Sequence, residues 1–231
     1  DMIATIRSRC RHLGLRIPTA SAVADLLVRE GVATPDVALE SARAAQSHIG
    51  LARALARDPQ MRERRRAIIT APASVRSVGE AVMAADRLLE TAKAQADAQV
   101  SERNAREKAE LMRQLGMGEG ESAPKASRTM IRQLEEDQKR RSKRALTDAI
   151  DRALIDLLAI YRDVLMVQVG GDGELINTDL TDLVHQIALD STPRQTLARV
   201  DHIETARKRL VSNGNPLLVL EDMAISLRPQ A

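Results

Sequence analysis

Aromatic side chains are almost absent from this sequence of 231 residues. It has no Phe and no Trp, and its only Tyr is Tyr161. Proteins that bind single-stranded nucleic acid by stacking use several aromatic side chains, so this chain offers no such platform. Apart from Tyr161 and one Cys, the apolar residues, which make up 44% of the chain, are Leu, Ile, Val, Ala and Met. A core that is rich in Ala favours helices packed at close distance.

The chain also has a single cysteine and a small net charge. Cys10 is the only cysteine, which excludes an intrachain disulfide and favours a reducing, cytoplasmic location. The 35 basic and 32 acidic residues give a formal charge of +3. Such a mixed surface permits some contact with DNA phosphates, but it lacks the dense positive field of a dedicated nucleic-acid-binding protein. No run of about 18 apolar residues is present, so we expect no membrane-spanning helix and no membrane partner.

The usual sequence signatures of catalysis are missing as well. None of the 11 glycines is followed by Lys, so the phosphate-binding Gly-Lys-Ser/Thr pattern is absent. The four histidines are scattered, and one cysteine cannot complete a zinc site, so we expect no metal and no cofactor bound by this chain. No His and acid are positioned by sequence to activate Ser8 or Cys10 as a nucleophile. We therefore expect no active site within the chain, and these patterns leave open whether the protein is an enzyme.

Start and stop signals predict a group of short helices over 18–62. The expected caps are Thr19 or Ser21 for the first helix and Thr34 for the second, and the third helix is expected to begin near Ser47. Gly31 and Asp58-Pro59 are the expected stops. This segment is predicted to form a small helical module.

A seam of small apolar residues at alternating steps of three and four predicts a long helix from Ser74. Its members are Val75, Val78, Val82, Ala85, Leu89, Ala92 and Ala96. The chain then becomes highly charged over 101–144, with a glycine-rich break at 116–124. A second seam, from Leu146 to Leu165, predicts another long helix. The two helices are expected to form an antiparallel hairpin with a docked apolar end and a charged, projecting end.

Three further helices are predicted after a glycine-rich turn at 170–173. Their expected caps are Thr178, Thr192 within a capping box, and Asn215. Only 11–17 alternates polar and apolar residues in the way a strand does. The predicted fold class is therefore mostly α.

One segment near the N-terminus gathers side chains that suit chemistry. Thr5-Ile6-Arg7-Ser8-Arg9-Cys10-Arg11 contains three arginines, a serine and a cysteine. The guanidinium of arginine is planar and permanently charged, and it can bond two oxygens of a phosphate or carboxylate. The residues alone leave two interpretations open: a basic edge at the entrance of a strand, or an arginine offered to an anion on a partner.

The same segment resembles the Ser-Arg-Cys motif of AAA+ clamp-loader subunits, which lies near the end of the ATPase domain just before its last strand. Residues 47–55 are similar to the lid segment that carries the second sensor in that family, and residues 203–218 resemble the end of the bacterial collar domain. The resemblance implies three parts: 1–17 is the C-terminal end of an AAA+ α/β domain, 18–62 a small helical lid, and 63–231 an all-helical collar for oligomerisation. The charged hairpin extension at 101–144 departs from the family pattern.

The resemblance also implies a function within the bacterial DNA polymerase III holoenzyme, a nucleotidyltransferase. The chain is most similar to a non-hydrolysing clamp-loader subunit. Arg9 matches the arginine that reaches in trans to ATP with magnesium on a neighbouring subunit, and Arg7, Ser8 and Cys10 belong to the same motif. Arg53 matches the second-sensor position, where it either retains a nucleotide contact or only pairs with an acid. The implied partners are the tau/gamma ATPase subunits and the delta subunit and, through the assembled complex, the sliding clamp and primer-template DNA.

Two alternatives stay open. The chain begins at Asp1, and we expect it to be the C-terminal part of a longer protein. The first alternative is that a nucleotide site or a zinc module lies upstream. An upstream Gly-x-x-x-x-Gly-Lys-Ser/Thr would make the protein an ATPase subunit of the tau/gamma type. The other alternative is a helical scaffold that oligomerises through the apolar seam of 74–100.

Overall fold

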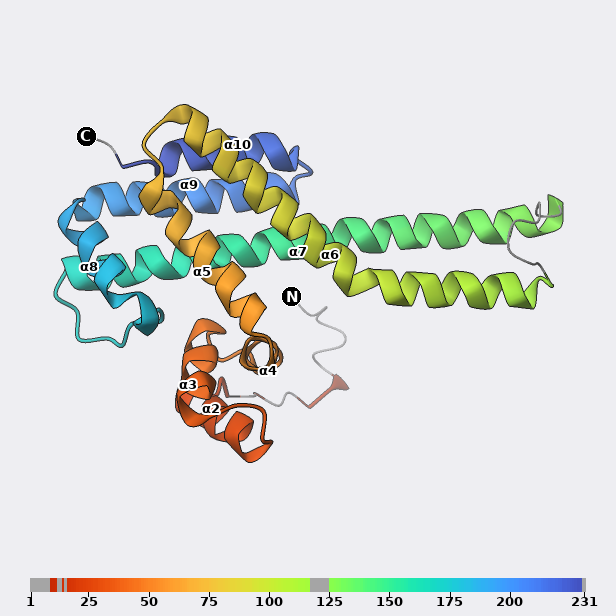
Figure 1. Cartoon of the computed structure of the whole chain (residues 1–231), viewed down its shortest axis with the longest axis horizontal. Coiled ribbons are helices and arrows are strands. Elements are labelled where there is room, and N and C mark those ends of the chain that lie inside the picture. The colour runs from red at the N-terminus through yellow and green to blue at the C-terminus, as the bar shows by residue number, and fades with distance from the viewer. Residues whose placement is uncertain (1–8, 12–13, 15, 117–124, 230–231) are drawn as a thin grey trace. The chain divides into compact units, whose positions relative to one another are not determined.

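The computed structural model describes residues 9–11, 14, 16–116 and 125–229, and the chain divides into two compact units, 1–61 and 62–231 (Figure 1). Every regular element in these described ranges is helical, and none of their residues belongs to a strand. The predicted mostly-α fold class is therefore confirmed. The strand predicted over 11–17 lies partly outside the described residues, and its described positions adopt no regular structure. The assignment of an AAA+ end, a lid and a collar stays a prediction.

The N-terminal unit contains the three predicted short helices, α2 (Ala20–Arg29), α3 (Pro35–Ala44) and α4 (Ile49–Arg57). The Thr19 hydroxyl accepts a hydrogen bond from the backbone N–H of Ala22 at 3.2 Å and caps α2. Gly31 then ends this helix at a positive φ of 66°, which costs glycine little. The core of the unit is small and rich in alanine; its buried residues include Val23, Leu27, Ala38, Ala42, Ala52 and Leu55.

Helix α4 begins at Ile49, near the predicted start at Ser47. His48 is the cap, because its Nδ1 accepts a hydrogen bond from the backbone N–H of Leu51 at 3.1 Å. Ser47 itself has a φ of 67°, in the left-handed region. Such a residue belongs to the turn before a helix and not to its cap, which adopts an extended conformation.

Helix α5 (Pro59–Ser74) was not predicted as a separate element. Its first half is dominated by arginines, and Ile69 is its only buried residue. A helix with so few apolar contacts gives no periodic signal in the sequence. The boundary between the two units falls within this helix.

Helices α6 (Val78–Gln114) and α7 (Lys125–Gln168) form the predicted antiparallel hairpin (Figure 1). The predicted start of α6 at Ser74 is wrong, because Ser77 and Glu80 form a capping box that begins the helix four residues later. Val78 is consequently 49% exposed. The buried seam of α6 consists of Ala81, Ala85, Leu89, Ala92, Ala96 and Val100.

Beyond Val100 and Ala145 the two long helices continue as a polar arm, in green in Figure 1. No described residue of 101–144 is buried. Polar side chains join the two helices here: Arg141 donates to Asn104 Oδ1 at 2.7 Å and to Glu107 at 2.8 and 3.1 Å. Polar pairs between two helices specify the register of the helices, but they contribute little to the stability of the fold. The predicted glycine-rich break at 116–124 lies outside the described residues except for Gly116.

The rest of the C-terminal unit packs around α7. It consists of the short 3-10 helix η1 (Thr178–Leu180) and the helices α8 (Thr181–Leu189), α9 (Pro193–Val211) and α10 (Pro216–Leu227). Helix α7 packs against α6, α8 and α9, and α10 packs against α6 and α9. The fully buried core includes Ile150, Leu154, Leu157, Ile160, Val164, Ile203 and Leu220.

Two of the three predicted caps in this unit are confirmed. Thr192 forms the capping box with Gln195, and Asn215 caps α10 with its side chain. Thr178 was predicted to cap a helix, but it is the first residue of η1. None of the helices in the described part of the chain is long and apolar enough to cross a membrane.

Candidate functional site

The basic segment at the N-terminus is only partly described. Arg9, Cys10 and Arg11 are exposed, and Cys10 carries a free thiol. Arg7 and Ser8 lie outside the described residues. Among the residues that are described, none forms a hydrogen bond or ion pair with Arg9. An exposed guanidinium is suited to binding an anion, and the role predicted for Arg9 stays a prediction.

Arg53, at the predicted second-sensor position, is held by a carboxylate of its own unit. Its Nε and Nη2 donate to the two carboxylate oxygens of Glu30 at 2.9 and 2.8 Å. A planar guanidinium matches a carboxylate in this two-bonded geometry. The hydrogen bond from Arg53 lowers the pKa of Glu30, and the same bond raises the pKa of Arg53. The pair links the end of α2 to α4, and about two thirds of each side chain is shielded from solvent.

A second polar site, which the sequence did not reveal, lies in the C-terminal unit. Arg65 on α5 donates from Nε to Asp156 on α7 at 3.1 Å and from Nη2 to Asn177 at 2.6 Å. The side chains of Arg65 and Asp156 are only 10% and 7% exposed. Burial raises the pKa of the Asp156 carboxyl, and the charge of Arg65 opposes that shift. Ionic contacts of this kind anchor α5 to the bundle in addition to Ile69, which is buried in its core.

Asp163 is the most buried acid of this cluster, with a fully shielded side chain. Its carboxylate accepts hydrogen bonds from the backbone N–H groups of Ile176 and Asn177 at 3.0 and 2.8 Å, and from Asn177 Nδ2 at 2.9 Å. Arg162 donates to it at 2.9 Å. Since every one of these partners belongs to the chain, Asp163 serves to fix the loop that precedes η1.

The lone aromatic ring also has a charged neighbour. The Arg199 guanidinium lies 5.8 Å from the centre of the Tyr161 ring, within the range of a cation–π contact. Both residues are buried. Burial raises the pKa of the Tyr161 phenol to about 12. On α9, Leu197 is 52% exposed, and Thr196 and Arg199 occupy the inner face.

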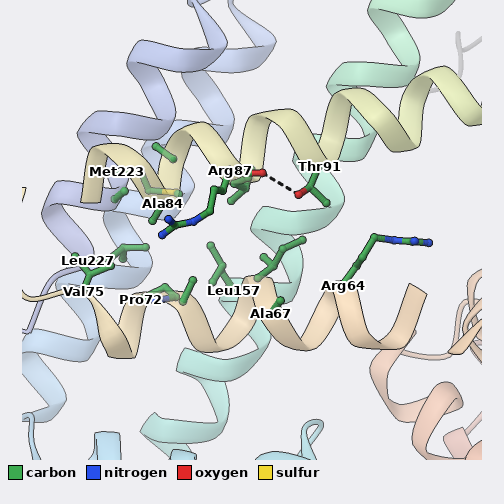
Figure 2. Close-up of a pocket in the computed structure, with 15 residues that line it drawn as sticks. Arg64, Ala67, Pro72, Val75, Ala84, Arg87, Thr91, Leu157, Met223 and Leu227 are labelled. Carbon is green, nitrogen blue, oxygen red and sulfur yellow. Dashed lines mark hydrogen bonds between the residues drawn. The ribbon is translucent and has the colours of Figure 1, made fainter. Parts of the chain in front are cut away.

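A cleft with a volume of about 220 Å³ lies between α5 and α6 (Figure 2). One wall is the face of α5 that carries Arg64 and Ala67, and the other is the face of α6 that carries Ala84, Arg87 and Thr91. Its floor is formed by Leu157 of α7 and by Ala224, Met223 and Leu227 of α10. The lining includes two arginines and no acidic residue.

The side chains of these sites are engaged mainly with one another. In the part of the chain that the structure describes, no three His, Cys, Asp or Glu residues are grouped so as to hold a metal ion. Within the same ranges the buried carboxylates, Asp156 and Asp163, are engaged by arginine and amide donors. The described sites are therefore suited to holding helices together and to binding, with Arg9, Arg53 and the α5–α6 cleft as the positions of interest.

Comparison with known proteins gives one partial match of note. Over 72 residues the chain is 39% identical to the DNA polymerase III subunit delta' of Bacillus subtilis (strain 168). No family model matches the chain. No solved structure matches it at a significant level. The matched segment represents 31% of this chain and 22% of the relative, so the chain is similar to that subunit over a limited part of both.

Proposed function

We propose that this chain is the C-terminal part of a clamp-loader subunit of the delta-prime type, which acts in DNA replication within a DNA polymerase III holoenzyme. The observation that carries the proposal is the 39% identity to the delta' subunit over 72 residues. The Ser8-Arg9-Cys10 sequence, which resembles the family motif, also supports the proposal. In this proposal the helices of 18–62 are the lid, and those of 63–231 are the collar that assembles the ring.

The pairing of Arg53 favours a subunit that hydrolyses nothing. A second-sensor arginine that serves a nucleotide must leave its guanidinium available to the phosphates. Arg53 instead has both arms of its fork bonded to Glu30 at 2.8 and 2.9 Å. Binding a phosphate at this position would first have to break two charge-assisted hydrogen bonds. The pair therefore supports a structural role for Arg53 within the lid.

Arg9 is the residue proposed to act on a neighbour. Its exposed guanidinium would reach the terminal phosphate of ATP, with magnesium, bound by an adjacent tau/gamma-type ATPase subunit. There it would stabilise the negative charge that develops as the phosphoryl group is transferred. Arginines supplied in trans raise the rate of such reactions by about 10³–10⁵ in well-studied GTPases. This chain itself would bind no cofactor, and the complex would act on the sliding clamp and primer-template DNA in the cytoplasm.

Assembly is the direct test of this proposal. The full protein that contains this chain is co-expressed with the ATPase and delta clamp-loader subunits of the same cell, and the mass of the purified complex is measured. We expect a stable hetero-oligomer in which the chain is present. A protein that fails to join the complex would contradict the proposal. A homo-oligomer formed without any ATPase partner would instead support a helical scaffold, and ATP hydrolysis by the full protein alone would support a tau/gamma-type subunit.

A further inference from the structure

We infer that the α5–α6 cleft is a docking site for a partner polypeptide that inserts one bulky apolar side chain and carries an acidic residue beside it. This inference goes beyond the proposed function and does not depend on it, since it stands on the lining of the cleft. The two walls and the floor all belong to the C-terminal unit.

The depth of the cleft comes from small side chains. Alanines occupy the positions of α5, α6 and α10 that face the hollow, among them Ala71, Ala84 and Ala224. A hydrophobic core normally closes such a gap with larger residues, because interiors are packed as densely as organic crystals. This chain has no Phe or Trp that could fill it from another segment. The space of about 220 Å³ fits one large apolar side chain supplied from outside.

The positive charge at the opening of the cleft indicates which kind of partner residue should lie beside the inserted apolar side chain. Figure 2 shows Arg87 reaching from α6 into the gap toward α5, while the Arg64 side chain on α5 points away from the other labelled lining residues. No acidic residue lines the cleft. Among the described residues, the Arg87 guanidinium has no hydrogen bond or ion pair. A carboxylate next to the inserted side chain would supply a negatively charged partner for the Arg87 guanidinium.

The shape favours a polypeptide over a small molecule. The wall on α5 extends from Arg64 to Pro72, so the cleft follows this helix for about two turns. Ala67 and Arg87 on its two walls are exposed, so the hollow stays open along its side. An extended or helical segment can lie along such an opening while it places an anchor side chain inside. A compact ligand would use only a part of it.

Methyl NMR of the full chain labelled at methionine tests this inference. The probe is the blocked tetrapeptide Gly-Phe-Asp-Gly. Its matched controls are Gly-Ala-Asp-Gly, which lacks the anchor, and Gly-Phe-Lys-Gly, which reverses the charge. We expect saturable shifts of the Met223 methyl, on the floor of the cleft, and none of Met130, which lies on the arm. The acidic Phe peptide should bind about threefold or more tightly than the Lys peptide.

Variants separate the docking site from non-specific binding. Arg87→Glu should reverse the preference in favour of the Lys peptide, while Lys108→Glu, an equal change of charge on the exposed arm, should not. Ala84→Leu should fill the cleft and abolish the Met223 shift, while Ala98→Leu on an exposed face of α6 should keep it. Because Arg87 is exposed, its variant keeps the test decisive even if Ala84→Leu fails to fold.

Three results would overturn the inference. The first is the absence of any Met223 shift with the acidic Phe peptide. The second is a preference for that peptide that persists in Arg87→Glu. The third is binding of 3-phenylpropionate as tight as that of the peptide, which would assign the cleft to a small amphiphilic anion and not to a polypeptide.

Discussion

Arg53 on α4 and Glu30 at the end of α2 are joined by two hydrogen bonds of 2.9 and 2.8 Å, one from each arm of the guanidinium fork. The two residues are 23 positions apart in the sequence. Their contact closes the small N-terminal unit across two helices that otherwise meet through alanine-rich packing. It also occupies the arginine that family resemblance would assign to a nucleotide.

The titration of Glu30 should report this pair directly. Arg53 lowers the pKa of Glu30, so the stabilisation is present above the ordinary carboxyl range and is lost as the pH falls through the lowered value. In Arg53→Gln the pKa of Glu30 should rise toward its ordinary value, as measured by carbon-detected NMR of the carboxyl group. An identical titration of Glu30 in wild type and Arg53→Gln would mean that the pair does not form in solution.

Replacing Asp163 should destabilise the C-terminal unit strongly. Asp163→Ala removes the acceptor of four hydrogen bonds in a site with no access to solvent. Leaving buried donors unpaired costs about 2–4 kcal/mol in the free energy of unfolding. Urea unfolding followed through Tyr161 measures this cost for the bundle alone, because Tyr161 is the only aromatic residue of the chain.

Asp179 provides the matched control for that measurement. It pairs with Arg66 at 3.2 Å, but the Arg66 side chain is 57% exposed. Asp179→Ala should therefore cost about 1 kcal/mol or less. Equal losses of unfolding free energy in the two variants would show that the buried Asp163 cluster stabilises the fold no more than the exposed Asp179–Arg66 pair does.

The ionisation of Tyr161 offers a spectroscopic test of the core. Burial raises the pKa of its phenol from 10.0 to about 12. The unfolded chain therefore loses this proton at lower pH than the folded chain, and the stability of the bundle should fall as the pH rises through this interval. An absorbance titration of the single tyrosine should show a midpoint near the higher value. A midpoint near 10 would mean that the ring is accessible to water.

The polar arm should be dispensable for the fold. No described residue of 101–144 is buried. Glu102 and Lys143 can be joined by a short glycine-rich turn, because the pairing of Asn104 with Arg141 places them at the same level of the hairpin. The shortened chain should keep its helical circular dichroism per residue and a melting temperature within a few degrees of the parent chain. Loss of cooperative unfolding would show that the arm stabilises the bundle.

Much of the helical pattern was readable from the sequence because it depends on local chemistry. The caps at Thr19, Thr192 and Asn215 each rest on contacts within three residues, and those were predicted. The predicted start of the long helix at Ser74 was wrong. It rested on the apolar seam, which was extended back to Val75, whereas the capping box of Ser77 starts the helix at Val78. Periodicity alone could not choose between these two starts.

The tertiary sites were beyond the reach of the sequence. Arg65 contacts Asp156 and Asn177, which lie 91 and 112 residues away. No spacing rule connects residues so far apart, and an Arg-rich helix such as α5 resembles a solvated surface. The cleft was likewise unpredictable, because it results from alanines on three helices that come together only in the fold. The sequence singled out Arg9 and Arg53 as candidates and left open that Arg53 only pairs with an acid, but it could not identify Glu30 as that acid.

The rate of ATP hydrolysis by a reconstituted clamp-loader complex tests the central claim most directly. The full protein is prepared as wild type, as Arg9→Ala, and as Arg11→Ala, which removes an exposed arginine from the same segment. We predict that all three assemble equally, that Arg9→Ala lowers DNA-stimulated hydrolysis by about tenfold or more, and that Arg11→Ala leaves it within about twofold. Full hydrolysis by an assembled Arg9→Ala complex would contradict the account.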